Sequence, residues 1–213
     1  RMMYSRGWRQ NGEMDMVPVG DLFNHGEPAT VYVETNDDAV RFVTKDRCDT
    51  LSLSYGSPSN PHRFLIVFGF IDVNMPRMWS HLALQDERLE EFGGADPDLM
   101  VFYKDGTVSS AVWDCLLFLF LQRKPDLQEL FVQSHRNGNV ETKRGLHKQY
   151  RGPVTTILNQ HIQGQLHELY KLDVDSSIDT PNAALIRQHN DVLRNYFTRV
   201  LLRLNEDPFA SVE

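Results

Sequence analysis

The sequence predicts an α+β fold in which a strand-rich part, residues 1–75, precedes a mainly helical part, residues 76–213. Short β-branched or alternating runs, separated by turn residues, indicate strands in the first part. Apolar residues at helical spacing indicate helices in the second part, for example Phe197, Leu201 and Leu204 near its end. The 213 residues are enough for one large domain or two small ones.

Three short strands are expected in the first part. They are TVYVE (30–34), AVRFV (39–43) and LSLSY (51–55). Asn60 followed by Pro61 is typical of a helix N-cap and a first helical residue, and this helix is expected to end near Gly69. Its apolar side chains are expected in the core. These are Phe64, Leu65, Ile66 and Phe70.

The second part begins with a mixed stretch and continues as helices. Strands are expected at 78–84 and 99–103, with a glycine- and proline-containing loop between them. The helices that follow are expected at 108–122, 126–135, 141–172 and from Thr180-Pro181 onward. Gly152 and Pro153 predict a kink or a break within the third of them.

Composition excludes several classes of protein. The chain has 22 Lys and Arg against 29 Asp and Glu, a net charge of −7, which argues against a nucleic-acid partner. The longest apolar run, residues 116–121, is far shorter than the roughly 20 residues of a membrane span, so no membrane association is expected. Hydrophobic residues make up 41% of the chain, which argues against disorder.

Cysteine and histidine usage argues against a metal site. The two cysteines, Cys48 and Cys115, are too few for a disulfide scaffold or a cysteine-based zinc site. No two of the eight histidines stand at H-x-H or H-x-x-x-H spacing, so no metal is expected. The cysteine count suits an intracellular, reducing compartment, without distinguishing cytoplasm, nucleus or plastid.

Two short stretches stand out when they are considered together. The first is VPVGDLFNH (17–25), where an apolar run ends in Asp21, Asn24 and His25. The second is LSLSYGSPSNPHRFLIVFGFI (51–71), where a strand ends in Tyr55-Gly56, a turn carries Ser59-Asn60, and a short helix leads to Gly69-Phe70.

These stretches resemble the SET-domain methyltransferases. The similarity is to the Rubisco large-subunit lysine methyltransferase type, which includes the actin-histidine methyltransferases. That family has a D-x-x-N-H segment and a Y-G-x-x-S-N segment in this order, and MYSRGW (3–8) resembles its upstream S-R pair. Each match is weak alone, and the joint pattern of types, order and spacing is more specific.

The resemblance implies a fold and a division of the chain. Residues 1–75 would be the C-terminal part of a SET domain, in which the two segments cross in a knot-like arrangement at the active site. Residues 76–213 would be the helical domain that holds the protein substrate in this branch of the family. The resemblance covers only the C-terminal half of such an enzyme. The family's glycine-containing cofactor loop has no counterpart here, so this stretch alone can be inactive.

The resemblance also implies an activity, S-adenosylmethionine-dependent methylation of a lysine, or less readily a histidine, in a protein substrate. Asn24 and His25 would bind the cofactor through backbone and side-chain hydrogen bonds. Tyr55 would be the catalytic residue, with its hydroxyl beside the transferring methyl group. Ser5 and Asp21 would lie near the substrate channel; a hydroxyl on a helix surface and an acid in a turn are equally open interpretations of these two residues.

Phe68 is the remaining candidate substrate-binding residue. Many members of the family have a tyrosine near the target nitrogen, and this sequence has a phenylalanine there. The missing hydroxyl would leave more room and one hydrogen bond fewer to the amine, which predicts the addition of more than one methyl group. Phe68 is equally compatible with an ordinary place in the core.

Ordinary structural roles are the alternatives for the two central residues. Asn24 is also typical of a helix cap in a polar turn, and Tyr55 of an aromatic residue at a strand end with its hydroxyl in solvent. For the whole chain, the alternatives are a non-catalytic interaction module derived from a SET domain and a helical scaffold unrelated to methyl transfer. The sequence does not indicate the target protein or the oligomeric state.

Overall fold

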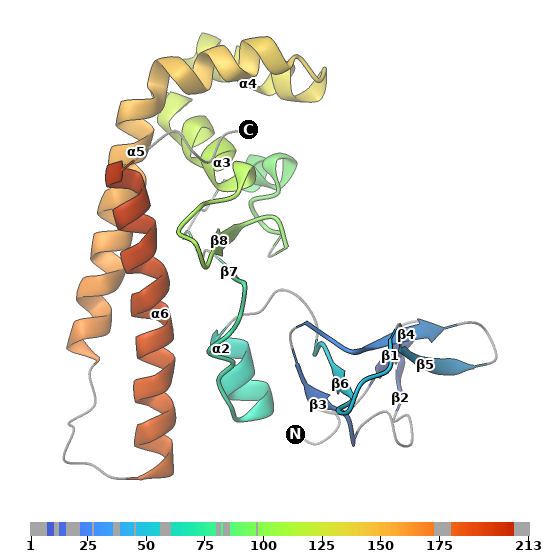
Figure 1. The fold of residues 1–213 in the computed structure, drawn as a ribbon. Helices are drawn as coiled ribbons and strands as arrows, with labels where there is room; N and C mark the ends of the chain where they lie inside the picture. Colours follow the sequence, from blue (N-terminus) through green and yellow to red (C-terminus); the bar gives the residue numbers. More distant parts are fainter. Residues whose placement is uncertain are drawn as a thin grey trace. The chain divides into compact units, whose positions relative to one another are not determined.

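The computed structural model describes residues 8–10, 13–15, 22–26, 28–35, 39–44, 46–55, 61–79, 82, 86–96, 98–172 and 180–206. The chain divides into two compact units, residues 1–75 and residues 76–213, which are considered separately below. Small sheets lie in both units, and the long helices lie in the second (Figure 1). The general α+β class is therefore confirmed, while the SET fold stays a prediction.

The first unit contains a two-stranded and a four-stranded sheet. Strands β1 (Trp8–Gln10) and β2 (Glu13–Asp15) pair antiparallel. The four-stranded sheet has the order β3-β6-β4-β5. Its strands are β3 (Asn24–His25), β4 (Val31–Thr35), β5 (Val40–Thr44) and β6 (Ser52–Leu53).

The four-stranded sheet confirms the three strands expected from the sequence. The first two begin one residue later than expected, and the third is shortened to β6. Strands β4 and β5 form an antiparallel pair in which Val31 lies opposite Thr44. Strand β6 is parallel to both of its neighbours, β3 and β4, so it joins two parts of the chain that are distant in sequence.

A short helical segment follows the sheet and ends where the sequence predicts. It consists of α2 (Pro61–Arg63) and the π-helical turn η2 (Phe64–Phe68). Gly69 ends it in the left-handed region, with φ 77°, and donates its N–H to the carbonyl of Phe64 at 3.0 Å. The expected cap, Asn60, lies outside the described residues.

One side chain of this segment does not lie where the sequence predicts. Phe64 is fully buried, but Ile66 is 69% exposed, so its expected place in the core is wrong. The π-helical turn explains the difference: the rings of Phe64 and Phe68 lie 5.4 Å apart on one side of the turn, and Ile66, midway between them, faces outward.

The second unit begins with a small hairpin-like sheet. Strands β7 (Arg77–Trp79) and β8 (Val101–Tyr103) pair antiparallel, with Met78 opposite Phe102. Strand β7 begins one residue before the expected range 78–84 and ends at Trp79, and β8 begins two residues later than the expected range 99–103. Between them lies the 3-10 helix η3 (Glu87–Phe92), which the side chain of Asp86 caps by accepting the N–H of Arg88 at 3.0 Å.

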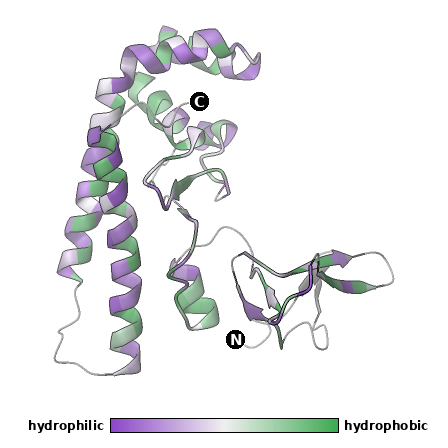
Figure 2. Ribbon diagram, viewed as in Figure 1, coloured by the Kyte–Doolittle hydropathy of each residue, from purple (hydrophilic) through white to green (hydrophobic). Residues whose placement is uncertain are grey.

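Four helices make up most of the described residues that follow. They are α3 (Ser110–Phe120, continued by η4, Leu121–Arg123), α4 (Pro125–Arg136), α5 (Val140–Lys171) and α6 (Pro181–Glu206). Helix α3 is mostly hydrophobic and its residues 111–118 are all buried, whereas α5 and α6 alternate between hydrophobic and hydrophilic faces (Figure 2). Helix α3 thus forms the core, against which α5 packs.

The expected break at Gly152-Pro153 is not observed, because α5 continues through Pro153 as one 32-residue helix. Pro153 has no N–H to donate to the carbonyl four residues earlier, which weakens the helix there without ending it. Helix α5 packs against α3 and α4 and also against α6, and Figure 1 shows it changing direction along its length, in agreement with the expected kink.

Helix α6 begins as predicted. The Thr180 hydroxyl oxygen accepts the N–H of Ala183 at 3.1 Å and so caps the helix that starts at Pro181. The apolar residues at helical spacing in α6, among them the expected Phe197, Leu201 and Leu204, form a ladder that is buried along most of its length. Its buried members are Val192, Leu193, Tyr196, Phe197, Val200 and Leu204. Within the described residues, every helix is too short or too polar to cross a lipid bilayer.

Candidate active site

Strands β3 and β6 bring the two unusual stretches of the sequence side by side. They pair in parallel, with Asn24 opposite Ser52 and His25 opposite Leu53. The N–H of Gly26 extends this contact by donating to the carbonyl of Leu53 at 3.2 Å. The sequence predicts that these stretches meet, and the structure places them in contact.

Gly26 is required by this close approach. A Cβ atom added at Gly26 would lie 2.5 Å from the hydroxyl oxygen and 2.6 Å from the Cβ of Ser52. No side chain fits there unless the two strands separate. Sequence reasoning did not identify Gly26, although its position directly after Asn24-His25 was a signal.

The imidazole of His25 connects three segments of the first unit. Its Nδ1 atom accepts the main-chain N–H of Tyr55 at 3.2 Å, and its Nε2 atom lies 3.1 Å from the carboxylate Oδ2 of Asp72. Because Nδ1 is an acceptor, the ring proton must be on Nε2, from which it is donated to Asp72. The two side chains are only 5% and 12% exposed.

The phenol of Tyr55 points back toward the same segment. Its hydroxyl donates to the main-chain carbonyl of Phe23 at 2.7 Å, a part-buried hydrogen bond. The alternative in which this hydroxyl lies in solvent is therefore not observed. Asn24 lies in β3 with an exposed side chain, and its alternative role as a helix cap is not observed either.

Rings of five residues pack together around His25 and Tyr55, and we name them the aromatic cluster. Its members are His25, Tyr55, Phe64, Phe68 and Phe70. The ring centroids of Tyr55 and Phe68 lie 4.7 Å apart, and those of His25 and Phe64 lie 4.8 Å apart. The helical segment that ends at Gly69 thus places the rings of Phe68 and Phe70 against those of His25 and Tyr55.

The structure brings together four of the six residues that the sequence singles out: Asn24, His25, Tyr55 and Phe68. The other two, Ser5 and Asp21, lie outside the described residues, as do Gly56, Ser59 and Asn60. Asp72 is an additional site residue that sequence reasoning missed. In the sequence, its signal was an acid directly after an apolar run. In the structure, its Oδ1 atom accepts the N–H of Asn74 at 2.9 Å in a turn.

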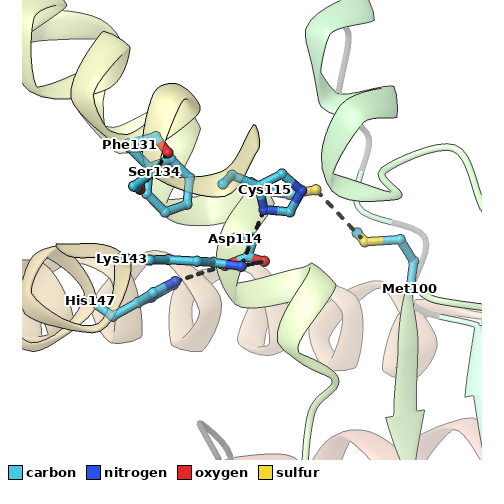
Figure 3. Close-up of polar contacts among 8 residues, drawn as sticks. Met100, Asp114, Cys115, Phe131, Ser134, Lys143 and His147 are labelled. Atoms are coloured by element: carbon cyan, nitrogen blue, oxygen red, sulfur yellow. Dashed lines mark hydrogen bonds and ion pairs between the residues drawn. The ribbon is translucent and has the colours of Figure 1, made fainter. Parts of the chain in front are cut away.

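The second unit holds a separate polar cluster between its helices. The carboxylate of Asp114, on α3, accepts from Lys143 Nζ at 2.5 Å and from His147 Nε2 at 2.7 Å, both on α5 (Figure 3). Lys143 Nζ also lies 3.2 Å from Nδ1 of His135 on α4. The Asp114 side chain is 6% exposed, and its charge is balanced by Lys143 within the cluster. These contacts join three helices, which is a structural role.

Cys115, the next residue on α3, is buried beside this cluster. Burial is the larger cause and the negative charge of Asp114 the smaller, and together they raise the pKa of the Cys115 thiol to about 12. Such a thiol is not a nucleophile at neutral pH. In the part of the chain that the structure describes, no three or more His, Cys, Asp or Glu side chains gather in a way that could hold a metal ion.

Comparisons with protein-family models, with curated proteins and with solved structures find no match to this chain.

Proposed function

We propose that this chain carries the catalytic residues of an S-adenosylmethionine-dependent protein N-methyltransferase that acts on a lysine side chain, with histidine as the other possible acceptor. The observation that carries the proposal is the placement of the Tyr55 phenol, whose hydroxyl donates to the carbonyl of Phe23 immediately before Asn24 and His25. The sequence pattern that resembles the SET methyltransferases requires these residues to share one site, and they lie together.

The residues present suit S-adenosylmethionine. The exposed side-chain amide of Asn24 offers donors and an acceptor for the polar groups of the cofactor. The faces of Tyr55, Phe68 and Phe70 favour a positively charged sulfonium through cation–π attraction. Both ring nitrogens of His25 are engaged within the protein, so His25 would contact the cofactor through its main chain.

When bound, S-adenosylmethionine would supply an electrophilic methyl group. Tyr55 already gives its phenolic hydrogen to Phe23, so toward any further partner its oxygen acts as an acceptor. The phenolic oxygen would accept a hydrogen bond from the amine and so orient the lone pair of the amine nitrogen along the line of transfer. Alignment of this kind lowers the barrier by several kcal/mol, up to about 10. The surrounding rings would desolvate the amine and favour its neutral, nucleophilic form.

We assign the helical second unit, by resemblance, to the binding of the protein substrate. Its slightly basic helices fit this role only in part, because the 9 Lys and Arg against 6 Asp and Glu of residues 141–204 also suit an ordinary solvated surface.

Calorimetric titration of the full-length protein with S-adenosylmethionine tests the proposal. We expect saturable binding that Asn24→Ala weakens about tenfold, because the amide would make one or two hydrogen bonds to the cofactor. Asn182→Ala, at an exposed position on α6, is the matched control and should bind as the parent does. Absence of binding by the parent protein would favour the non-catalytic interaction module instead.

A further inference from the structure

We propose that Asp72 is a positioning residue that acts through His25 on Tyr55. It holds the imidazole in the tautomer and orientation in which Nδ1 can accept the main-chain N–H of Tyr55. Its effect on methyl transfer rests on the proposed function, whereas its effect on the imidazole does not.

The carboxylate of Asp72 is itself held in place. Its Oδ1 atom accepts the N–H of Asn74 at 2.9 Å, which leaves Oδ2 directed at Nε2 of His25 at 3.1 Å. Asp72 follows Ile71, whose side chain is buried, so the backbone before the carboxylate is also fixed. A carboxylate with both oxygens engaged can hold a partner in one orientation.

Only one state of the His25 ring satisfies both of its neighbours. With the proton on Nε2, the ring donates to Asp72 and presents the Nδ1 lone pair to the N–H of Tyr55. If the proton were on Nδ1, the ring N–H would face the main-chain N–H of Tyr55, which is also a donor. Asp72 would then face Nε2, which would have no hydrogen to donate. Edge contact with Phe64, at 4.8 Å between ring centroids, restricts rotation of the imidazole.

The position of the Tyr55 ring depends on this arrangement. The main chain of Tyr55 is held by His25, its ring lies 4.7 Å from that of Phe68, and its hydroxyl is held by Phe23. A phenol displaced by about 1 Å from its reacting geometry can lower a rate about a hundredfold. Asp72 therefore controls the placement of the phenol without touching the reacting atoms.

The experiment compares Asp72→Ala and Asp72→Asn with the parent protein, using long-range ¹H–¹⁵N NMR spectra of the His25 ring together with methyl-transfer kinetics. The parent should carry its ring proton on Nε2. In Asp72→Ala the two tautomers should exchange, and kcat should fall ten- to a hundredfold with KM for the protein substrate nearly unchanged. Asp72→Asn keeps an acceptor oxygen and should therefore retain much of the Nε2–H tautomer and much of the parent kcat.

The control is Asp96→Ala. Asp96 accepts the N–H of Asp98 at 2.8 Å in a turn like that of Asp72, but it lies in the second unit, and no histidine among the described residues bonds to it. It should leave the His25 spectrum and kcat as in the parent. This control separates loss of a turn-forming carboxylate from loss of the partner of His25.

The relation between tautomer and rate decides the outcome. The proposal is supported when kcat falls in step with the fraction of molecules that keep the Nε2–H tautomer, and it is overturned when the two change independently or neither changes. If Asp72→Ala does not fold, the isosteric Asp72→Asn is judged by the same relation. A parent that transfers no methyl group while its tautomer responds to Asp72 would contradict the proposed function and leave the structural role of Asp72 intact.

Discussion

The Nδ1 atom of His25 accepts the main-chain N–H of Tyr55 at 3.2 Å, although thirty positions separate the two residues. This hydrogen bond and the one from the Tyr55 hydroxyl to the carbonyl of Phe23 together hold the main chain and the side chain of Tyr55 against residues 23–25. This double attachment, more than the pairing of two-residue strands, defines the candidate site.

We expect Gly26→Ala to destabilise the first unit. The added methyl group would lie about 2.5 Å from the side chain of Ser52, so β3 and β6 would have to separate, at a cost of about 1–3 kcal/mol. Chemical denaturation measures the loss. Ser52→Gly in the same chain should restore part of it, and Gly145→Ala, at an open helical position, should leave stability unchanged or slightly raised. Equal stability of Gly26→Ala and the parent would refute the close approach.

Under the proposed function, we expect the parent protein to add more than one methyl group and Phe68→Tyr to shift the product toward monomethylation. The ring of Phe68 packs against Tyr55, so a hydroxyl added to it would narrow the site and offer the amine a further hydrogen bond. Mass spectrometry of the product gives the ratio. Phe120→Tyr, in the helical unit, is the control. Strict monomethylation by the parent would contradict the role given to Phe68.

We expect Asp114→Asn to destabilise the helical unit by about 3 kcal/mol, because it leaves the partly buried ammonium of Lys143 without its counter-charge. Thermal or denaturant unfolding measures the change. Asp191→Asn removes an exposed partner of Arg194 and should cost less than about 1 kcal/mol. Similar losses in both variants would show that the Asp114 cluster contributes no more than a surface ion pair.

We expect the Cys115 thiol to resist alkylation at pH 8 in the folded protein, since burial raises its pKa to about 12. A Cys48→Ser variant isolates this thiol, which should react only after denaturation. Its pKa in the unfolded chain is about 8.5, so the unfolded state ionises first and the free energy of unfolding should fall as pH rises from about 8.5 toward 12. Cys115→Ala should remove this part of the pH dependence. Rapid labelling of native Cys115 would contradict its burial.

Much of the fold follows from local sequence signals. The Thr180-Pro181 start of α6 depends only on neighbouring residues, and the burial of its ladder only on helical spacing, so both could be predicted. The exposure of Ile66 could not be predicted, because the π-helical turn that rotates it outward is set by the hydrogen bond that the Gly69 N–H donates to the Phe64 carbonyl. The continuity of α5 through Pro153 likewise depends on packing against three other helices.

The site residues that form a sequence pattern could be predicted, whereas those that matter through contacts between distant residues were missed. Asn24, His25 and Tyr55 form a recognisable order in the sequence. Asp72 and Gly26 do not, because their importance comes from a histidine 47 positions away and a serine on a paired strand. Side-chain partners at such distances are chosen by tertiary structure, which composition and spacing do not encode.

The central claim is that the Tyr55 phenol takes part in methyl transfer, and comparison of the parent with Tyr55→Phe tests it most directly. Transfer of an isotope-labelled methyl group from S-adenosylmethionine to protein should be lowered at least a hundredfold in Tyr55→Phe. Fold stability should fall by only about 1 kcal/mol, since one hydrogen bond to Phe23 is lost. Equal transfer by the two folded proteins, or no transfer by the parent, would contradict the account.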